Sequence, residues 1–155
     1  AGPTEIAIVA DHTARPGDIA ADLISQAEHD TIAAAVLITD SPELISQVET
    51  ELERRSAITK HSERIHAALR GVQSALVLVD SIDHAVEVAN AYAAEHLEII
   101  VANPEETASG IRNAGAVFLG AFSPVSLGDY SAGSITSFQP GDVLVTQVGF
   151  LCKVF

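Results

Sequence analysis

Positively charged residues are scarce in this sequence. Its 155 residues include 8 Lys and Arg against 21 Asp and Glu, which gives a formal net charge of −13 at pH 7. Such a charge repels a phosphate backbone, and no basic stripe is present on which nucleic acid could bind. We therefore expect no nucleic-acid partner.

Cysteine and long apolar runs are also nearly absent. Cys152 is the only cysteine, which excludes an intramolecular disulfide and fits a reducing cytoplasm. The longest apolar runs, such as residues 32–38, are far too short to cross a bilayer. No basic segment with an apolar core opens the chain, which begins with Ala1 instead of Met. We expect a soluble, cytoplasmic protein with no membrane partner, in a chain that begins within a longer protein.

Familiar nucleotide and nucleophile motifs are missing as well. There is no G-x-G-x-x-G, and residues 110–117 have the glycine spacing of a phosphate loop but carry Ala116 where a lysine is needed. A G-x-S-x-G nucleophile elbow is also absent. The sequence therefore shows no dinucleotide site of its own, and the positions of any cofactor-binding residues stay unknown.

What is present is an alternation of short β-branched runs and longer amphipathic stretches, with 48% hydrophobic residues, enough for the core of one domain. Pro16, Ser41 and Ser81 stand where helices should begin, and Gly71 where one should end. The pattern predicts strands at 5–11, 34–40, 74–80, 97–103 and 116–120, and helices at 17–29, 42–55, 62–70, 82–96 and 104–115.

Apolar strands separated by helices are typical of a mostly parallel sheet covered on both faces, because each parallel crossover needs a helix to return the chain. The predicted fold class is α/β, a three-layer Rossmann-like domain. The rhythm stops at Ala121, and residues 123–134 read as a loop rich in glycine and serine. Because parallel sheets bind ligands at the carboxyl ends of their strands, we expect the functional side chains at that edge.

Gln26 and His29 are the first candidate pair. They are three positions apart near the end of a predicted helix, a spacing that lets two side chains converge on one cation. A helix cap or a solvated face is the competing interpretation of this pair.

Glu95 and His96 form a second candidate pair. The imidazole could take the proton of an alcohol, and the carboxylate could activate water. The alternative is that the pair closes the helix predicted over 82–96, where His96 would favour the negative end of the helix dipole.

Asp129 follows a glycine in the loop after the last predicted strand. A carboxylate in this position is a suitable hard ligand for a divalent metal, although Asp after Gly is also ordinary turn chemistry.

Taken together, four motifs resemble the second half of histidinol dehydrogenase, in order and with similar separations. They are "AGPTEIAIVAD", "ADLISQAEHD", "ANAYAAEHLEII" and "AGAVFLGAFSPVSLGDYSAG", and they cover residues 1–134. The resemblance implies an NAD-dependent oxidation of L-histidinol to L-histidine through histidinal, at the end of histidine biosynthesis. It also implies a homodimer with one zinc per site.

The resemblance also implies roles for individual residues. Gln26, His29 and Asp129 resemble the zinc ligands, and Thr4 stands where the family usually has a serine that touches substrate. Glu95 and His96 match the acid–base pair, with His96 accepting the alcohol proton and Glu95 assisting the attack of water on the aldehyde. Thr4, Gln26, His29, His96 and Asp129 would then surround the substrate.

Two departures from the family pattern qualify this reading. Ala94 replaces the proline of the usual Tyr-Ala/Gly-Pro-Glu-His, which loosens the turn that presents Glu95. After Ser134 the resemblance ends, so residues 1–134 are expected to form the zinc and substrate-binding domain and residues 135–155 a divergent tail. The family's further histidine ligand and the half that contacts NAD have no counterpart here, so this chain is expected to be inactive alone. A non-catalytic Rossmann-like module and a dehydrogenase of another amino alcohol remain the alternatives.

Overall fold

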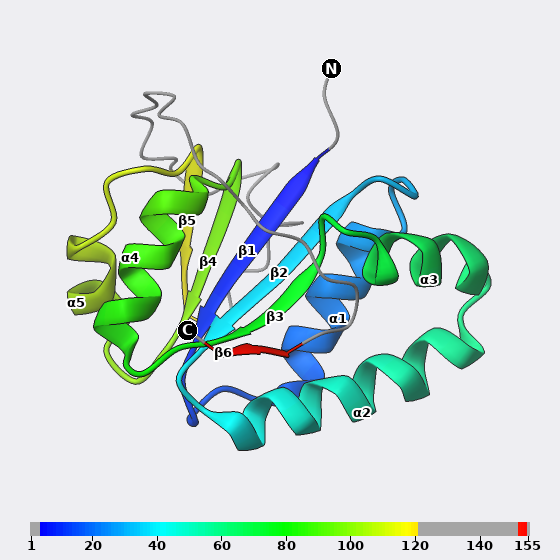
Figure 1. Cartoon of the computed structure of the whole chain (residues 1–155), viewed down its shortest axis with the longest axis horizontal. Coiled ribbons are helices and arrows are strands. Elements are labelled where there is room, and N and C mark those ends of the chain that lie inside the picture. The colour runs from blue at the N-terminus through cyan, green and yellow to red at the C-terminus, as the bar shows by residue number, and fades with distance from the viewer. Residues whose placement is uncertain (1–3, 121–151, 155) are drawn as a thin grey trace.

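A computed structural model describes residues 4–120 and 152–154, and these form one parallel sheet with helices on both faces (Figure 1). The strand order is β5-β4-β1-β2-β3-β6, and every neighbouring pair is parallel. The strands are β1 (Glu5–Ala10), β2 (Ala34–Thr39), β3 (Ala75–Leu78), β4 (His96–Ile100), β5 (Ala116–Leu119) and β6 (Cys152–Val154). The helices are α1 (Pro16–Ala27), α2 (Pro42–Ile58), α3 (Ser62–Arg70), α4 (Ile82–Tyr92) and α5 (Pro104–Ser109).

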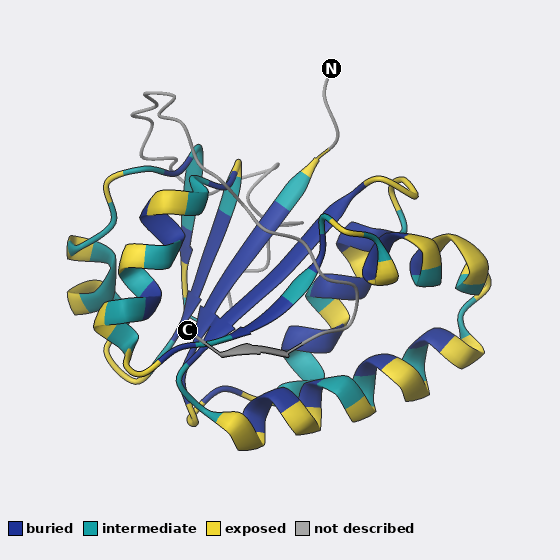
Figure 2. Ribbon diagram, in the orientation of Figure 1, coloured by how far each residue is buried: buried dark blue, intermediate teal, exposed yellow. Residues whose placement is uncertain are grey.

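Two apolar layers hold the helices to the sheet. Ile6 and Ile8 of β1 belong to the layer under α1, α2 and α3, whereas Ala7 and Val9 belong to the layer under α4. This split follows from the strand period of two, which sends successive side chains to opposite faces. Figure 2 shows the central strands buried along most of their length. The predicted three-layer parallel α/β fold is therefore confirmed.

The predicted helix starts are also confirmed. Ser41 and Ser81 each accept a hydrogen bond from a backbone N–H three residues on, at 3.2 and 3.1 Å, and Pro16 opens α1. These caps satisfy N–H groups that the first turn of a helix leaves without partners. None of the helices described in residues 4–120 has the length and apolar character needed to cross a membrane.

The predicted helix ends are less accurate. The fourth helix was expected to reach residue 96 but ends at Tyr92, because Ala93 adopts a left-handed conformation with φ 54°. The next strand begins at His96, and α5 ends at Ser109, six residues before its predicted end. Helix α2 runs on to Ile58, beyond the predicted end at Arg55. The end of the tail predicted to diverge contributes β6 beside β3.

Candidate active site

The functional candidates in the described residues lie at the edge where the parallel strands begin, here called the amino edge. The expectation of a site at the carboxyl ends is therefore wrong for these residues. Gln26 ends α1, which runs back from the carboxyl end of β1 to its start, and His96 is the first residue of β4. The rule that favours carboxyl ends concerns ligands bound by loops that follow strands, whereas these side chains precede strands or end a helix.

Thr4 and Gln26 are in direct contact. The Gln26 Nε2 donates a hydrogen bond of 2.8 Å to the Thr4 hydroxyl oxygen, across 22 positions of sequence. Gln26 is 7% exposed, so this bond satisfies a polar group in a largely buried place. Its carbonyl oxygen, the atom that could bind a metal, lies outside this hydrogen bond.

His29 lies in the turn after α1 and is exposed. Its backbone N–H donates to the Gln26 backbone carbonyl at 3.2 Å, so the two residues lie in one turn at the end of α1. Imidazole nitrogen is a common zinc ligand, so His29 fits a zinc site by type, and Gln26 would add an amide oxygen beside it. Asp129, the third predicted ligand, lies outside the described residues. In the portion of the chain that the structure describes, no three His, Cys, Asp or Glu residues converge to hold a metal.

Glu95 lies in the turn after α4, which ends at Tyr92, and His96 is the first residue of β4, so the interpretation that they close a helix is wrong. The Glu95 N–H donates to the Glu5 carboxylate at 3.2 Å, and the His96 Nδ1 lies 3.3 Å from the Glu5 carbonyl oxygen. The His96 ring also packs beside Phe118 with ring centroids 6.3 Å apart. Glu95 itself is exposed and His96 half-buried, so both remain accessible to a ligand.

Strand β5 fixes the same turn from the other side. The Ala116 N–H donates to the Glu95 carbonyl at 2.8 Å, and the Gly115 N–H donates to the Ala94 carbonyl at 3.0 Å. A Cβ atom at Gly115 would lie 2.5 Å from the Glu95 carbonyl oxygen, closer than such contacts allow. Glycine is therefore required at position 115 for the strand to approach the turn this closely.

Glu98 is a buried acid that sequence reasoning missed. It is 1% exposed, between Ile8 and Phe118 in register, and it faces the same side of the sheet as His96. Burial, together with the nearby Asp22 and Asp18 carboxyl groups, raises the pKa of Glu98 to about 9. Burial also raises the pKa of Asp22. A proton held by Glu98 lets the two neighbouring carboxyl groups hydrogen-bond and removes a buried charge. Glu98 Oε2 is buried and has no hydrogen-bond partner among the described residues.

A sequence signal for Glu98 was available but ambiguous. The run "LEIIVAN" was recognised as a strand, yet an acid within an apolar strand is ordinarily expected on a solvent-exposed side. Only the packing of α1 against the sheet shows that Asp18 and Asp22 border this position.

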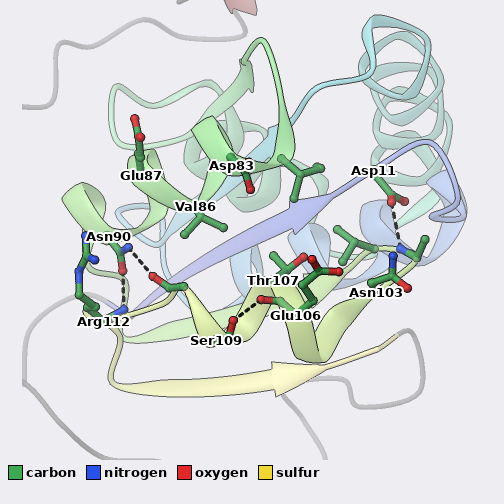
Figure 3. Close-up of a pocket in the computed structure, with 14 residues that line it drawn as sticks. Asp11, Asp83, Val86, Glu87, Asn90, Asn103, Glu106, Thr107, Ser109 and Arg112 are labelled. Atoms are coloured by element: carbon green, nitrogen blue, oxygen red, sulfur yellow. Dashed lines mark hydrogen bonds between the residues drawn. The ribbon is translucent and has the colours of Figure 1, made fainter.

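A separate pocket of about 610 Å³ lies at the carboxyl edge of the sheet, between α4 and α5. Figure 3 shows this pocket, with Asp11 on the side opposite to Asn90 and Arg112. The buried polar side chains that line it are already hydrogen-bonded within the protein. The Asn90 side chain donates to the Gly110 carbonyl at 2.9 Å and accepts from the Arg112 N–H at 2.6 Å. Burial by itself would raise the pKa of Asp11, but hydrogen bonds from Thr13 and from the Ala102 N–H outweigh it and lower the pKa. These contacts hold loops in place, and none of the predicted site residues lines this pocket.

Comparison with known proteins agrees with the fold and with the motifs. A family model described as histidinol dehydrogenase matches residues 1–139. A histidinol dehydrogenase of Thermobifida fusca (strain YX) is 56% identical over all 155 residues, and one of Mycolicibacterium smegmatis is 63% identical over 134 residues, 86% of this chain. The chain covers 35% and 30% of these two relatives, about a third of their length.

A solved structure shows the same arrangement of the chain. The crystal structure of histidinol dehydrogenase from Elizabethkingia anophelis superposes with a TM-score of 0.81 at 38% identity. The match covers 86% of this chain and 30% of that one. On the family model and on these identities, this chain belongs to the histidinol dehydrogenase family of oxidoreductases.

Proposed function

We propose that this chain supplies the acid–base pair and part of the zinc site of an enzyme that oxidises L-histidinol to L-histidine, through histidinal, with NAD as the hydride acceptor. The proposal rests on the observation that two sets of candidate residues, Gln26 on one hand and Glu95 with His96 on the other, contact neighbouring residues at the start of β1. Thr4 holds the Gln26 amide there, and the next residue, Glu5, contacts both Glu95 and His96. Family membership supplies the chemistry that such a cluster would serve.

His96 is the proposed base of the first oxidation. Its Nδ1 faces the Glu5 carbonyl oxygen, which can only accept a hydrogen bond, so Nδ1 carries the ring proton and Nε2 is the basic nitrogen. Nε2 would take the hydroxyl proton of the alcohol as hydride leaves its carbon. Phe118 limits the rotation of the ring and keeps this nitrogen in one direction.

Glu95 is the proposed partner in the second oxidation. Its side chain is exposed at the same turn, while its backbone is held at both the N–H and the carbonyl. A carboxylate so placed could draw a proton from water as the water attacks the aldehyde.

Gln26 and His29, with Asp129, are the proposed zinc ligands, and Thr4, Gln26, His29, His96 and Asp129 the proposed substrate contacts. Zinc, when bound, would orient the amino and imidazole nitrogens of the substrate as a template. The Gln26 carbonyl oxygen and the exposed His29 imidazole are the donors that the described residues contribute. No residue of this chain is assigned to NAD. A homodimer and a cytoplasmic location complete the proposal.

Zinc affinity tests the ligand assignment without turnover. Calorimetric titration of the chain with zinc should show binding that Gln26→Ala, His29→Ala and Asp129→Ala each weaken by at least about ten-fold, the lower range for losses around a metal site. His61→Ala is the matched control, because His61 is an exposed imidazole at the N-cap of α3 that is not among the proposed ligands. Unchanged affinity in the His29 variant would show that the ligand assignment is wrong.

Turnover tests the reaction itself. Because the chain spans about a third of its relatives, NADH formation from L-histidinol with added zinc is measured for this chain alone and for the chain joined to the remaining family segments. We expect activity only in the joined protein, and its loss in His96→Ala but not in His61→Ala. Zinc binding with no NADH in the joined protein would support the non-catalytic module, and NADH only from other amino alcohols would support the related dehydrogenase.

A further inference from the structure

Glu5, the first residue of β1, contacts Glu95 and His96 of the segment that presents the acid–base pair, here called the acid–base turn (residues 93–96), and also Tyr92, which precedes it. Its carboxylate accepts from the Glu95 N–H at 3.2 Å and from the Tyr92 hydroxyl at 3.3 Å. Its backbone carbonyl faces His96 Nδ1 at 3.3 Å. Burial raises the pKa of Tyr92 above its usual range, and the Glu5 carboxylate adds to this, so the hydroxyl keeps its proton and remains a donor.

The position of Glu5 follows from strand geometry. Successive residues of β1 point to opposite faces, so Thr4 reaches Gln26 on α1 while the Glu5 side chain reaches Tyr92 at the end of α4. The start of β1 therefore contacts both the end of α1, through Thr4, and the acid–base turn, through Glu5. A shift of this strand would disturb both sides together.

The acid–base turn depends on Glu5 for one backbone group in particular. Strand β5 already holds the Ala94 and Glu95 carbonyls through the Gly115 and Ala116 N–H groups. The Glu95 N–H is instead held by the Glu5 carboxylate. This bond spans 90 positions of sequence and has a charged acceptor, which makes it stronger than a neutral hydrogen bond. Ala93, just before it, has a left-handed conformation that a non-glycine residue adopts only when its surroundings impose it.

We propose that Glu5 is the positioning residue of the acid–base turn: its carboxylate fixes the backbone of Glu95, and its carbonyl selects the His96 tautomer with the proton on Nδ1. The inference rests on the proposed function only in naming what the turn is for. The contacts themselves do not depend on substrate, zinc or NAD.

Nitrogen-15 NMR of the imidazole in the complete 155-residue chain tests the tautomer. With the ring neutral, the spectrum of the unmodified protein should show the proton of His96 on Nδ1. A His96 ring protonated on Nε2 would overturn the proposal, because Nδ1 could not then donate to the Glu5 carbonyl.

Amide hydrogen exchange at Glu95, measured in the same chain, tests the carboxylate. Glu5→Ala should accelerate exchange at this amide by at least about ten-fold, since a hydrogen bond to a charged acceptor is lost. Glu5→Gln keeps an acceptor oxygen at the same reach and should restore the exchange rate nearly to that of the unmodified chain. Glu63→Ala, which removes an exposed glutamate on α3, is the matched control.

Glu5→Asp provides the same test if Glu5→Ala does not fold, because it keeps the charge but withdraws it by one methylene. Faster exchange in Glu5→Asp with normal exchange in Glu5→Gln supports the positioning role. Amide exchange at Glu95 equal to that of the unmodified chain in Glu5→Ala, or in both conservative variants, overturns it. If these readings hold while histidinol oxidation fails in the joined protein, the positioning role stands and the proposed reaction does not.

Discussion

The Gln26 amide on α1 donates a 2.8 Å hydrogen bond to the hydroxyl of Thr4, which lies immediately before β1. The bond joins the end of a helix to the start of the strand that precedes it in the chain. The bond is made by the NH2 group of the Gln26 side chain, and it directs the side-chain carbonyl oxygen away from Thr4.

Removing the Thr4 hydroxyl should therefore weaken zinc binding without removing a ligand. Thr4→Val keeps the shape of the side chain but leaves the Gln26 amide unoriented, and we expect about a ten-fold loss of zinc affinity, as for other residues that orient a metal ligand. Thr4→Ser retains the hydroxyl and should bind zinc as the unmodified chain does. Equal zinc affinities of the Val and Ser variants by calorimetry would refute the orienting role.

Glu98 should make the protein less stable as the pH rises. Its pKa is about 9 in the folded chain against an ordinary 4.5, so between these pH values the unfolded chain has released a proton that the folded chain retains. The free energy of unfolding then decreases with rising pH through this window, and the contribution is fully favourable only below pH 4.5. Glu98→Gln is neutral in both states and should lose this dependence.

Urea unfolding across the window measures the effect. Near pH 9 the Glu98→Gln variant should be more stable than the unmodified chain by several kcal/mol, whereas below pH 4.5 the two should be similar. Glu63→Gln, at an exposed position, should follow the unmodified chain at every pH. A constant difference between Glu98→Gln and the unmodified chain would contradict the burial effect.

Gly115→Ala should displace the acid–base turn. The added methyl group meets the backbone carbonyl of Glu95 at 2.5 Å, and a backbone atom cannot rotate away as a side chain can. We expect a loss of about 1 to 3 kcal/mol of stability, as for other overpacked sites, together with faster amide exchange at Glu95. Gly110→Ala is the control, because its methyl group meets a Val86 side-chain methyl at 3.0 Å and the Thr107 carbonyl oxygen at an ordinary 3.5 Å. Similar thermal unfolding of both variants would argue against the close approach.

Ala93→Gly should stabilise the protein. Ala93 is the described non-glycine residue with positive φ, at 54°, and a left-handed conformation is strained when a Cβ is present. The gain in the folded state exceeds the added entropy of the unfolded chain, so we expect an increase of about 0.5 kcal/mol in the free energy of unfolding. Ala91→Gly, on the exposed face of α4, should instead lower it by about 1 kcal/mol. Denaturant unfolding that shows a loss in both variants would contradict the strain at Ala93.

Much of the fold could be predicted because its signals are local. The apolar runs that became β1 and β2 are buried throughout or nearly so, and Ser41 and Ser81 cap their helices with their own hydroxyls. Helix ends were less predictable, since the end of α4 depends on the strained conformation of Ala93 and not on a glycine or proline. The helical rhythm of residues 82–96 continues past the point where the backbone turns.

The candidate site was identified from motifs, but its position was not. Gln26, His29, Glu95 and His96 were found by residue type and spacing, and the zinc role of Asp129 stays a prediction because that residue lies outside the described chain. The edge of the sheet at which these residues lie was predicted wrongly. The spacing of residues within one segment does not show at which edge of the sheet that segment lies. Glu5 was not singled out, because an acid at the start of a strand has no distinguishing local pattern.

The sequence by itself determined a parallel α/β domain and its helix starts, and it supplied the candidate side chains, since periodicity and capping act between residues a few positions apart. Only the tertiary structure decided that Thr4 meets Gln26, that Glu5 holds the turn of Glu95 and His96, and that Glu98 is buried beside Asp22. These contacts join positions from 22 to 91 apart, and they form only when the packing of α1 and α4 on opposite faces brings the ends of distant elements to one edge of the sheet.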